Sequence, residues 1–268
     1  MPNTNYPRQG SILSLDTLRR TMGGKSDLYE FLSMYAHADV NMKNFQFRSA
    51  ADFTNADFWT VAKNAGTGNA NFALVVASGG YIQADTGTGD NDSVSLVGPI
   101  IYSGDENCGM EIRVQTDDIT SVNFEIGFID AVPGSDASGV SDIDTPAATF
   151  SDGALIQLDD DQTLKTLAFI TDGSTGSQNV AAPTFASPAG TNMVNATWHT
   201  FRIQLVGNFA ACWFDGVLAA VHDAGSTQAV GALEGGVLLA PWIYWRTRDT
   251  TASFPKISQA SVWQDVVA

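Results

Sequence analysis

The chain has 268 residues, 44% of them hydrophobic and 16% charged, with 25 glycines and a formal net charge of -16. This composition is typical of a turn-rich globular protein with enough apolar residues for a core. The acidic balance argues against nucleic acid or a membrane surface as a partner, because both attract clustered lysine and arginine.

The first 48 residues differ from the rest in charge. They contain six basic and four acidic residues, whereas the remainder carries a net charge of -18. Residues 1–10 have the composition of an extended arm and lack the basic start and apolar run of a signal peptide. No run of about 18 apolar residues follows that could span a bilayer. We therefore expect synthesis in a cytoplasm without export by a standard route.

Two short amphipathic segments follow the arm. Apolar residues recur at helical spacing over residues 14–22 and 26–35. Helices of this length are marginal in isolation, so they pack either on their own domain or on a neighbouring subunit. We predict a docking segment over residues 1–48 and a separate domain over residues 49–268. The candidate docking residues are Tyr6, Arg8, Leu15, Leu18, Arg19, Arg20, Leu28, Phe31 and Tyr35.

Beyond residue 44 the sequence has the alternation and turn residues of β structure. More than a dozen short strands separated by glycine, asparagine and aspartate predict a mainly β, two-sheet antiparallel jelly-roll sandwich. The predicted strands are residues 45–47, 58–63, 71–77, 81–84, 93–96, 111–116, 123–129, 154–158, 164–170, 199–206, 210–214, 217–221, 236–245 and 256–264. The long separators 131–152 and 173–196 are expected to be functional or contact-making loops.

The clearest pattern in the chain runs from Trp198 to Val221. Apolar residues alternate with polar ones, and the pairs Gly207-Asn208 and Asp215-Gly216 supply turns, which predicts two hairpins sharing a central strand. A strand-opening tryptophan and an aromatic-Asp-Gly turn, with the stretches 90–96, 109–114 and 123–131, resemble the concanavalin A-like lectin and laminin-G jelly rolls of tailed-bacteriophage structural proteins. The matched positions are scaffold, so the resemblance carries over no catalytic or metal-binding residue.

Catalytic patterns are missing from the sequence. A retaining glycosidase needs two carboxylates about 5 Å apart, and glucanases of this fold class carry closely alternating acids on one strand. The nearest candidates, Glu111, Glu125 and Asp130, do not match that spacing. The three histidines His37, His199 and His222 have no Gly-x-Ser-x-Gly motif near them, and Cys108 and Cys212 fit buried thiols better than a disulfide framework or a metal cluster. We predict that the chain is not an enzyme.

Two acidic runs are weak candidates for a calcium site, and no other cofactor is expected. Asp90 and Asp92 in one loop, and Asp159 and Asp161 in another, supply hard oxygen ligands, although such residues are common simply because they build turns. Exposed aromatics beside such loops would favour a glycan site. The segment 242–245 offers three aromatics, but its alternation fits a strand with Ile243 and Trp245 on one face.

The order of an extended arm, two short helical segments and a large acidic β domain, together with the resemblance, predicts a non-enzymatic virion protein, a capsid decoration or head-fibre component. It would lie on the capsid surface, dock on the major capsid protein through residues 1–48, and self-associate as a homo-oligomer, with no nucleic acid or membrane as partner. An alternative is a carbohydrate-binding or receptor-binding lectin-like module whose loops 85–92, 131–152 and 173–196 bind a glycan. A third reading is a glycoside hydrolase.

Overall fold

The computed structural model describes residues 40–46, 58–64, 71–75, 80–131, 138–140, 148–159, 167–173, 179–181, 193–222 and 233–265. The predicted arm and both predicted helical segments, with all nine candidate docking residues, lie outside these ranges, as does Asp161. Within the described residues the only helix is a single 3-10 turn, η2 (Gly104–Glu106), so no helix in this part of the chain is long enough to cross a membrane.

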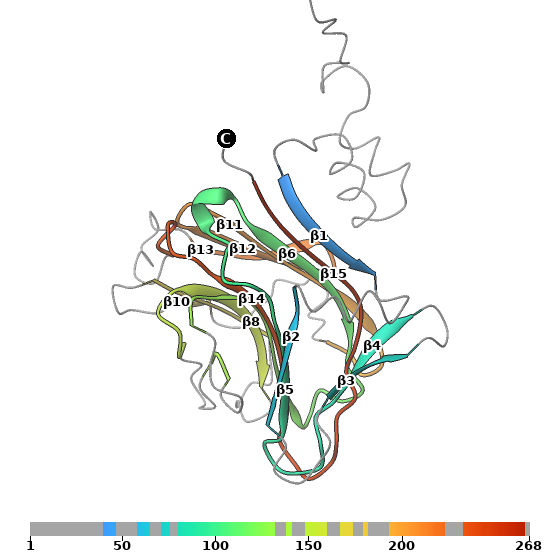
Figure 1. Ribbon diagram of the computed structural model, residues 1–268. Helices are drawn as coiled ribbons and strands as arrows, with labels where there is room; N and C mark the ends of the chain where they lie inside the picture. The colour runs from blue at the N-terminus through green and yellow to red at the C-terminus, as the bar shows by residue number, and fades with distance from the viewer. Residues whose placement is uncertain are drawn as a thin grey trace, which may run out of the picture.

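Two antiparallel sheets form a sandwich, which confirms the predicted fold class (Figure 1). The eight-stranded sheet contains, in spatial order, β13 (Val217–His222), β12 (Phe209–Phe214), β11 (Trp198–Val206), β6 (Gly109–Gln115), β15 (Lys256–Asp265), β4 (Tyr81–Asp85) and β3 (Asn71–Val75), with β1 (Val40–Gln46) also pairing with β15. The seven-stranded sheet contains β10 (Asn179–Ala181), β9 (Ala168–Asp172), β8 (Gly153–Asp159), β7 (Val122–Ile129), β14 (Ala240–Thr247), β5 (Ser93–Val97) and β2 (Thr60–Asn64).

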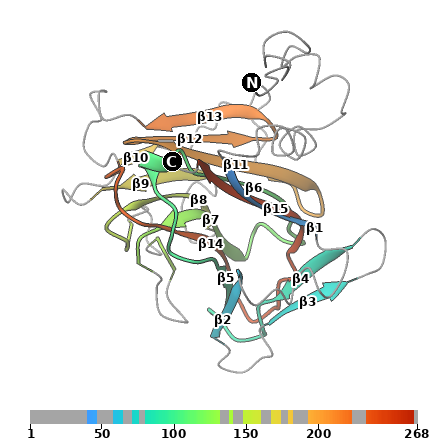
Figure 2. The same cartoon turned by 45° about the horizontal axis from the view of Figure 1, so that its top comes forward.

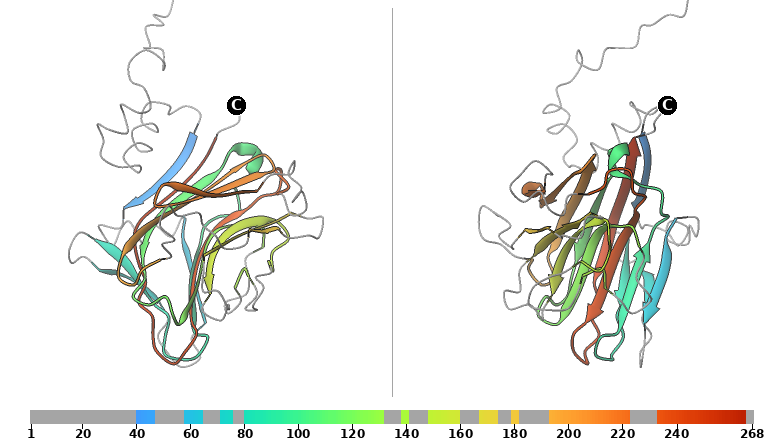
Figure 3. Two further views of the ribbon diagram at one scale, coloured as in Figure 1. Left: turned by 180° about the vertical axis from the view of Figure 1, so that it is seen from behind. Right: turned by 90° about the vertical axis from the view of Figure 1, so that its left-hand side faces the viewer.

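β15 organises the eight-stranded sheet. One of its edges pairs with β6, while its other edge pairs with β4 near its start and with β1 along the rest of its length. Figure 1 and Figure 3 show β1 lying along β15, and Figure 2 shows β12 and β13 at the opposite margin of the same sheet. Residues 40–46, which the sequence pattern placed in the docking segment, therefore form a strand of this sheet.

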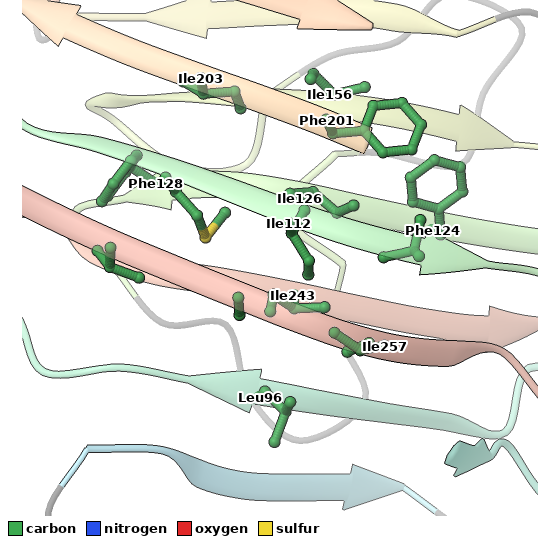
Figure 4. Close-up of a cluster of buried hydrophobic side chains, with 14 of the residues drawn as sticks. Leu96, Ile112, Phe124, Ile126, Phe128, Ile156, Phe201, Ile203, Ile243 and Ile257 are labelled. Carbon is green, nitrogen blue, oxygen red and sulfur yellow. The ribbon is translucent and has the colours of Figure 1, made fainter. Parts of the chain in front are cut away.

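The core lies between the two sheets. Strands from both layers contribute alternate side chains, among them Phe124 and Phe128 of β7 and Phe201 and Ile203 of β11 (Figure 4). Each such side chain stabilises the fold by about 1.5–3 kcal/mol relative to an exposed position. Ile243 also points into this core, as the alternation of β14 predicted.

The outer faces of the two sheets differ in exposure. Every residue of β7, β8 and β14 is buried, although successive side chains of a strand point to opposite faces. In β11, by contrast, buried residues alternate with partly exposed ones. The seven-stranded sheet therefore has a covered outer face along these strands. The eight-stranded sheet has a partly exposed outer face, on which Glu111, Ser261 and Trp263 are themselves buried.

Candidate ligand-binding face

The open outer face of the eight-stranded sheet, called here the open face, combines aromatic rings with cations and amides. The alternation of β11 sends Phe201 and its apolar neighbours into the core and leaves the intervening residues outside. The residues of the open face used below are Tyr81, Gly109, Glu111, Arg113, Gln115, Trp198, Arg202, Gln204, Trp213, Lys256 and Trp263.

One group of contacts centres on Trp198. The guanidinium carbon of Arg113 lies 5.1 Å from the centre of the Trp198 ring, and the Tyr81 ring meets the Trp198 ring edge-on at 6.3 Å. The Lys256 ammonium lies 5.4 Å from the Tyr81 ring centre and donates a hydrogen bond to Gln115 Oε1 at 3.0 Å. Both rings are partly exposed, so part of this aromatic surface can be reached by a ligand.

A second group surrounds Arg202. Its guanidinium carbon lies 4.7 Å from the centre of the Trp213 ring and 5.5 Å from that of Trp263, and its NH2 group donates a hydrogen bond to Gln204 Oε1. Trp263 lies against Gly109, where a Cβ atom would come within 2.4 Å of the indole. The absence of a side chain at Gly109 therefore makes room for the Trp263 ring.

The covered face of the seven-stranded sheet is polar but closed. Cross-strand neighbours form one row from Ser95 through Tyr244 and Glu125 to Gln157, and a second row from Ser93 through Arg246 and Asn123 to Asp159. All eight side chains are buried. Residues 138–140 and 148–150 pair with each other over this face, where Val140 and Phe150 pack on an apolar cluster that includes Trp242.

Glu125 lies under that covering segment. Its carboxylate accepts hydrogen bonds from Gly139 N at 2.7 Å, Val140 N at 3.1 Å and Trp242 Nε1 at 2.8 Å. Burial raises its pKa to about 7, and these three donors together with the charge of Arg246 limit the rise. The side chain therefore links the covering segment to the sheet.

The acids considered for glycoside hydrolysis are not brought together. Glu111 lies on the open face, and Glu125 lies on the opposite side of the sandwich. Asp130 follows β7 and accepts hydrogen bonds from Ser151. β7 directs Asn123, Glu125, Gly127 and Ile129 to the covered face, and only one of these four is acidic, so β7 lacks the alternating acids of the glucanase pattern.

The two acidic runs considered for calcium meet at an arginine. Arg248 donates from Nε to Asp159 Oδ1 at 3.0 Å and from NH2 to Asp159 Oδ2 at 2.5 Å, while its NH1 donates to Asn91 Oδ1 at 3.0 Å. Asp92 is buried and accepts from Gly89 N at 2.7 Å, and Asp90 is exposed. Across the described residues, no group of three or more histidine, cysteine or acidic side chains could hold a metal ion.

The described histidines and cysteines occupy structural positions. His199 Nδ1 lies 2.8 Å from Asp215 Oδ2, and its Nε2 accepts from Val194 N at 3.2 Å, so both ring nitrogens are engaged. His222 is buried between the sheets, where burial lowers its pKa to about 4. Burial also raises the pKa of both thiols, Cys108 and Cys212, which are free and buried as predicted.

Sequence reasoning missed most of the open face. It singled out Trp198 and Trp213 only as scaffold, and it did not connect them with Arg113, Arg202 or Lys256. The period-two alternation of the predicted strands was a usable signal, because it assigns these residues to the side opposite the core. What the sequence could not supply was the register that sets Lys256 beside Gln115 and Arg202 beside Trp213.

No protein-family model matches the sequence, and a search of curated proteins gives no match. Among solved structures, the potassium-bound carbohydrate recognition domain of Emp46p is similar with a TM-score of 0.53 and 12% identity, covering 83% of this chain and 96% of that one. A β-glucanase from Bacillus licheniformis has a TM-score of 0.51 and 13% identity over 83% of this chain and 97% of its own.

A glycosyl hydrolase family protein from Mycobacterium fortuitum is similar to the same degree, with a TM-score of 0.52 and 12% identity over 82% of this chain and 98% of its own. The chain thus has the fold of the concanavalin A-like lectin and glucanase jelly rolls, as the sequence predicted. None of these three structures is a virion protein, and the comparisons give no support for the predicted virion origin.

Proposed function

We propose that this protein is a non-catalytic carbohydrate-binding protein that binds glycans on its open face. The observation that carries the proposal is the group formed by Trp198, Tyr81, Arg113, Gln115 and Lys256, in which partly exposed rings stand beside hydrogen-bonding side chains. This was the alternative reading of the sequence, now assigned to a sheet face rather than to loops.

The chemistry of the open face suits a sugar ring. A sugar presents a C–H face that packs on an aromatic ring and hydroxyl groups that both donate and accept hydrogen bonds. Trp198 and Tyr81 supply apolar rings with polar edges. Gln115 and the neighbouring cations supply amide, guanidinium and ammonium groups at the ring edges. A few polar groups around an aromatic surface are what fix the orientation of a bound ligand.

The covered face is less suited to be the primary binding surface. Its polar rows are buried, and Gly139 and Val140 of the covering segment, residues 138–140 and 148–150, already donate hydrogen bonds to the carboxylate of Glu125. A ligand would have to displace this segment and leave those hydrogen bonds unmade. The open face requires no such rearrangement.

The virion reading stays a prediction. It rests on residues 1–48, most of which lie outside the described ranges, and no described contact bears on a capsid partner or on self-association. The fold neighbours that include a carbohydrate recognition domain and a β-glucanase favour the carbohydrate-binding alternative.

A glycan array probed with the full chain tests the proposed function, with and without calcium, followed by titration calorimetry on the strongest hit. Trp198→Ala and Tyr81→Ala are each expected to weaken binding by about tenfold, because each removes a ring from the contact surface. Phe209→Ala is the matched control, since Phe209 is an aromatic 47% exposed at the other end of the same sheet.

Both test positions are partly exposed, so the variants are expected to fold, and their melting temperatures check this. Binding lost in the Trp198 and Tyr81 variants but kept in the Phe209 variant supports the proposal. An array on which no glycan binds, or affinity that survives both substitutions, rules out the open face as a glycan site.

A further inference from the structure

We infer that the glycans bound by the open face are acidic, with carboxylate or sulfate groups along the sugar chain; this inference rests on the proposed function. It comes from where the chain places its positive charge. The protein as a whole carries a net charge of -16, yet three cations, Arg113, Arg202 and Lys256, share this one face.

The strand register arranges these cations in a diagonal line. Arg202 on β11 lies opposite Glu111 on β6, two residues before Arg113. Lys256 on β15 lies opposite Gln115, two residues after Arg113. The cations thus step regularly across β11, β6 and β15, with diagonal neighbours about 7–8 Å apart at the backbone. A line of spaced positive groups suits an extended chain with repeated negative groups.

Aromatic rings hold the cations in place. Arg113 lies over Trp198, Lys256 over Tyr81, and Arg202 over both Trp213 and Trp263. A guanidinium packed on an aromatic ring keeps its N–H groups at the edge, where they can donate to a carboxylate in pairs. Because the side chains are already ordered, binding costs less conformational entropy than it would for free surface lysines.

The cations differ in how far neighbouring acids offset them. Glu111 is the cross-strand neighbour of Arg202 and carries a negative charge on the same face. At the edge of the sheet, Asp85 accepts a hydrogen bond from Gly87 N within its own turn. Arg113 is exposed, and within the described part of the chain no acid forms an ion pair with it. Arg113 and Lys256 are therefore the cations that a ligand can use most directly.

Two other described arginines serve the opposite sheet. Arg246 donates to Tyr244 Oη at 2.6 Å, and Arg248 forms the ion pair with Asp159. At physiological ionic strength, charges more than about 8 Å apart are largely screened, so the acidic remainder of the chain does not cancel the local field. The open face therefore attracts an anionic chain at short range despite the negative net charge.

The test uses matched ligand pairs, oligogalacturonates with free carboxylates and the same oligomers fully methyl-esterified, at 150 mM salt. We expect the wild-type protein to prefer the free acid by about tenfold and to lose that preference as salt is raised. Arg113→Gln and Lys256→Gln should each weaken binding of the acid more than binding of the ester, so that the preference for the acid falls by roughly threefold to tenfold. Lys63→Gln, on β2 of the other sheet, changes the net charge equally and serves as the control.

The outcomes separate this inference from the proposed function. Equal binding of acid and ester, both lost in Trp198→Ala, overturns the acidic ligand and leaves glycan binding intact. A preference for the acid that falls as much in Lys63→Gln as in Arg113→Gln places the charge effect elsewhere and also overturns it. If the full glycan array, including uronate and sulfated sugars, shows no binding at all, the proposed function is overturned, and this inference with it.

Discussion

Trp242 Nε1 donates a hydrogen bond to Glu125 Oε2 across 2.8 Å, joining neighbouring strands of the seven-stranded sheet beneath its covering segment. Gly139 and Val140 donate to the same carboxylate. Three donors meet one fully buried acid, so the hydrogen bonds favour the ionised form while the loss of water favours the neutral form. This balance makes the covered face sensitive to pH.

The first prediction follows from the raised pKa of Glu125, about 7 in the folded state against 4.5 as the ordinary value. Between these values the folded state binds more protons than the unfolded state, so stability is lost as pH rises from 4.5 to 7. In Glu125→Gln this loss should vanish. The difference in unfolding free energy between wild type and variant should therefore shift by about 3 kcal/mol across the window, measured by denaturant titration at each pH.

Glu106→Gln, at a partly exposed acid in η2, is the control and should track the wild type. A constant difference between wild type and Glu125→Gln from pH 4 to 8 would mean that Glu125 has the same pKa in the folded and unfolded states. The hydrogen bonds from Gly139, Val140 and Trp242 would then balance burial.

The second prediction concerns His222, whose effect has the opposite sign. Burial lowers its pKa to about 4 from 6.5, so the unfolded state binds more protons in between and stability is lost as pH falls from 6.5 to 4. His222 Nδ1 lies 2.7 Å from Thr171 Oγ1, which links β13 to β9 of the other sheet. His222→Asn should remove the stability loss on the acid side, at most about 3 kcal/mol, and should add a cost that does not vary with pH, because the imidazole ring no longer packs on Phe169.

Because the Glu125 and His222 effects oppose each other between pH 4.5 and 6.5, the wild-type curve should be flatter than that of either variant in this range. The double variant provides the check: the two changes should add, since the side chains lie on different faces. A His222→Asn curve parallel to the wild type across pH 4 to 6.5 contradicts the neutral buried imidazole.

Much of the fold was predictable because one physical signal, the period of two, recurs along the chain. It placed Phe201, Ile203 and Leu205 in the core, and it separated Ile243 and Trp245 from Trp242 and Tyr244. Turn chemistry worked equally well at Asp215-Gly216, where both residues have positive φ.

The sequence could not show which outer face is covered. Burial of Glu125 depends on contacts with Gly139 and Val140, which lie in a loop whose path no local pattern determines. Likewise, Asp159 looked like a calcium ligand because its partner, Arg248, lies 89 residues away in the chain. Pairings of this kind come from sheet order, not from local sequence.

A third prediction tests the close approach of β7 and β8 at Gly127. An added Cβ would lie 2.0 Å from the backbone oxygen of Ala154, which cannot move without breaking the ladder. Gly127→Ala should therefore destabilise the protein by about 3 kcal/mol or more. Gly207→Ala is the control, because a Cβ there meets nothing within 4 Å and only its φ of +55° is unfavourable, at about 1 kcal/mol. Equal melting temperatures for the two variants would refute the steric account.

The last prediction concerns the place where calcium was expected. The side chains of Arg248 and Asp159 are 3% and 0% exposed and form two hydrogen bonds, so Asp159→Asn leaves a buried guanidinium without its counter-charge. We expect a loss of about 3 kcal/mol or more. Asp90→Asn, an exposed change in the neighbouring loop, should cost less than about 0.5 kcal/mol. Millimolar calcium or its removal by a chelator should not move the melting temperature of the wild type, because Arg248 already neutralises Asp159. A calcium-dependent rise in melting temperature that Asp90→Asn abolishes would show that the two acidic loops bind the ion after all.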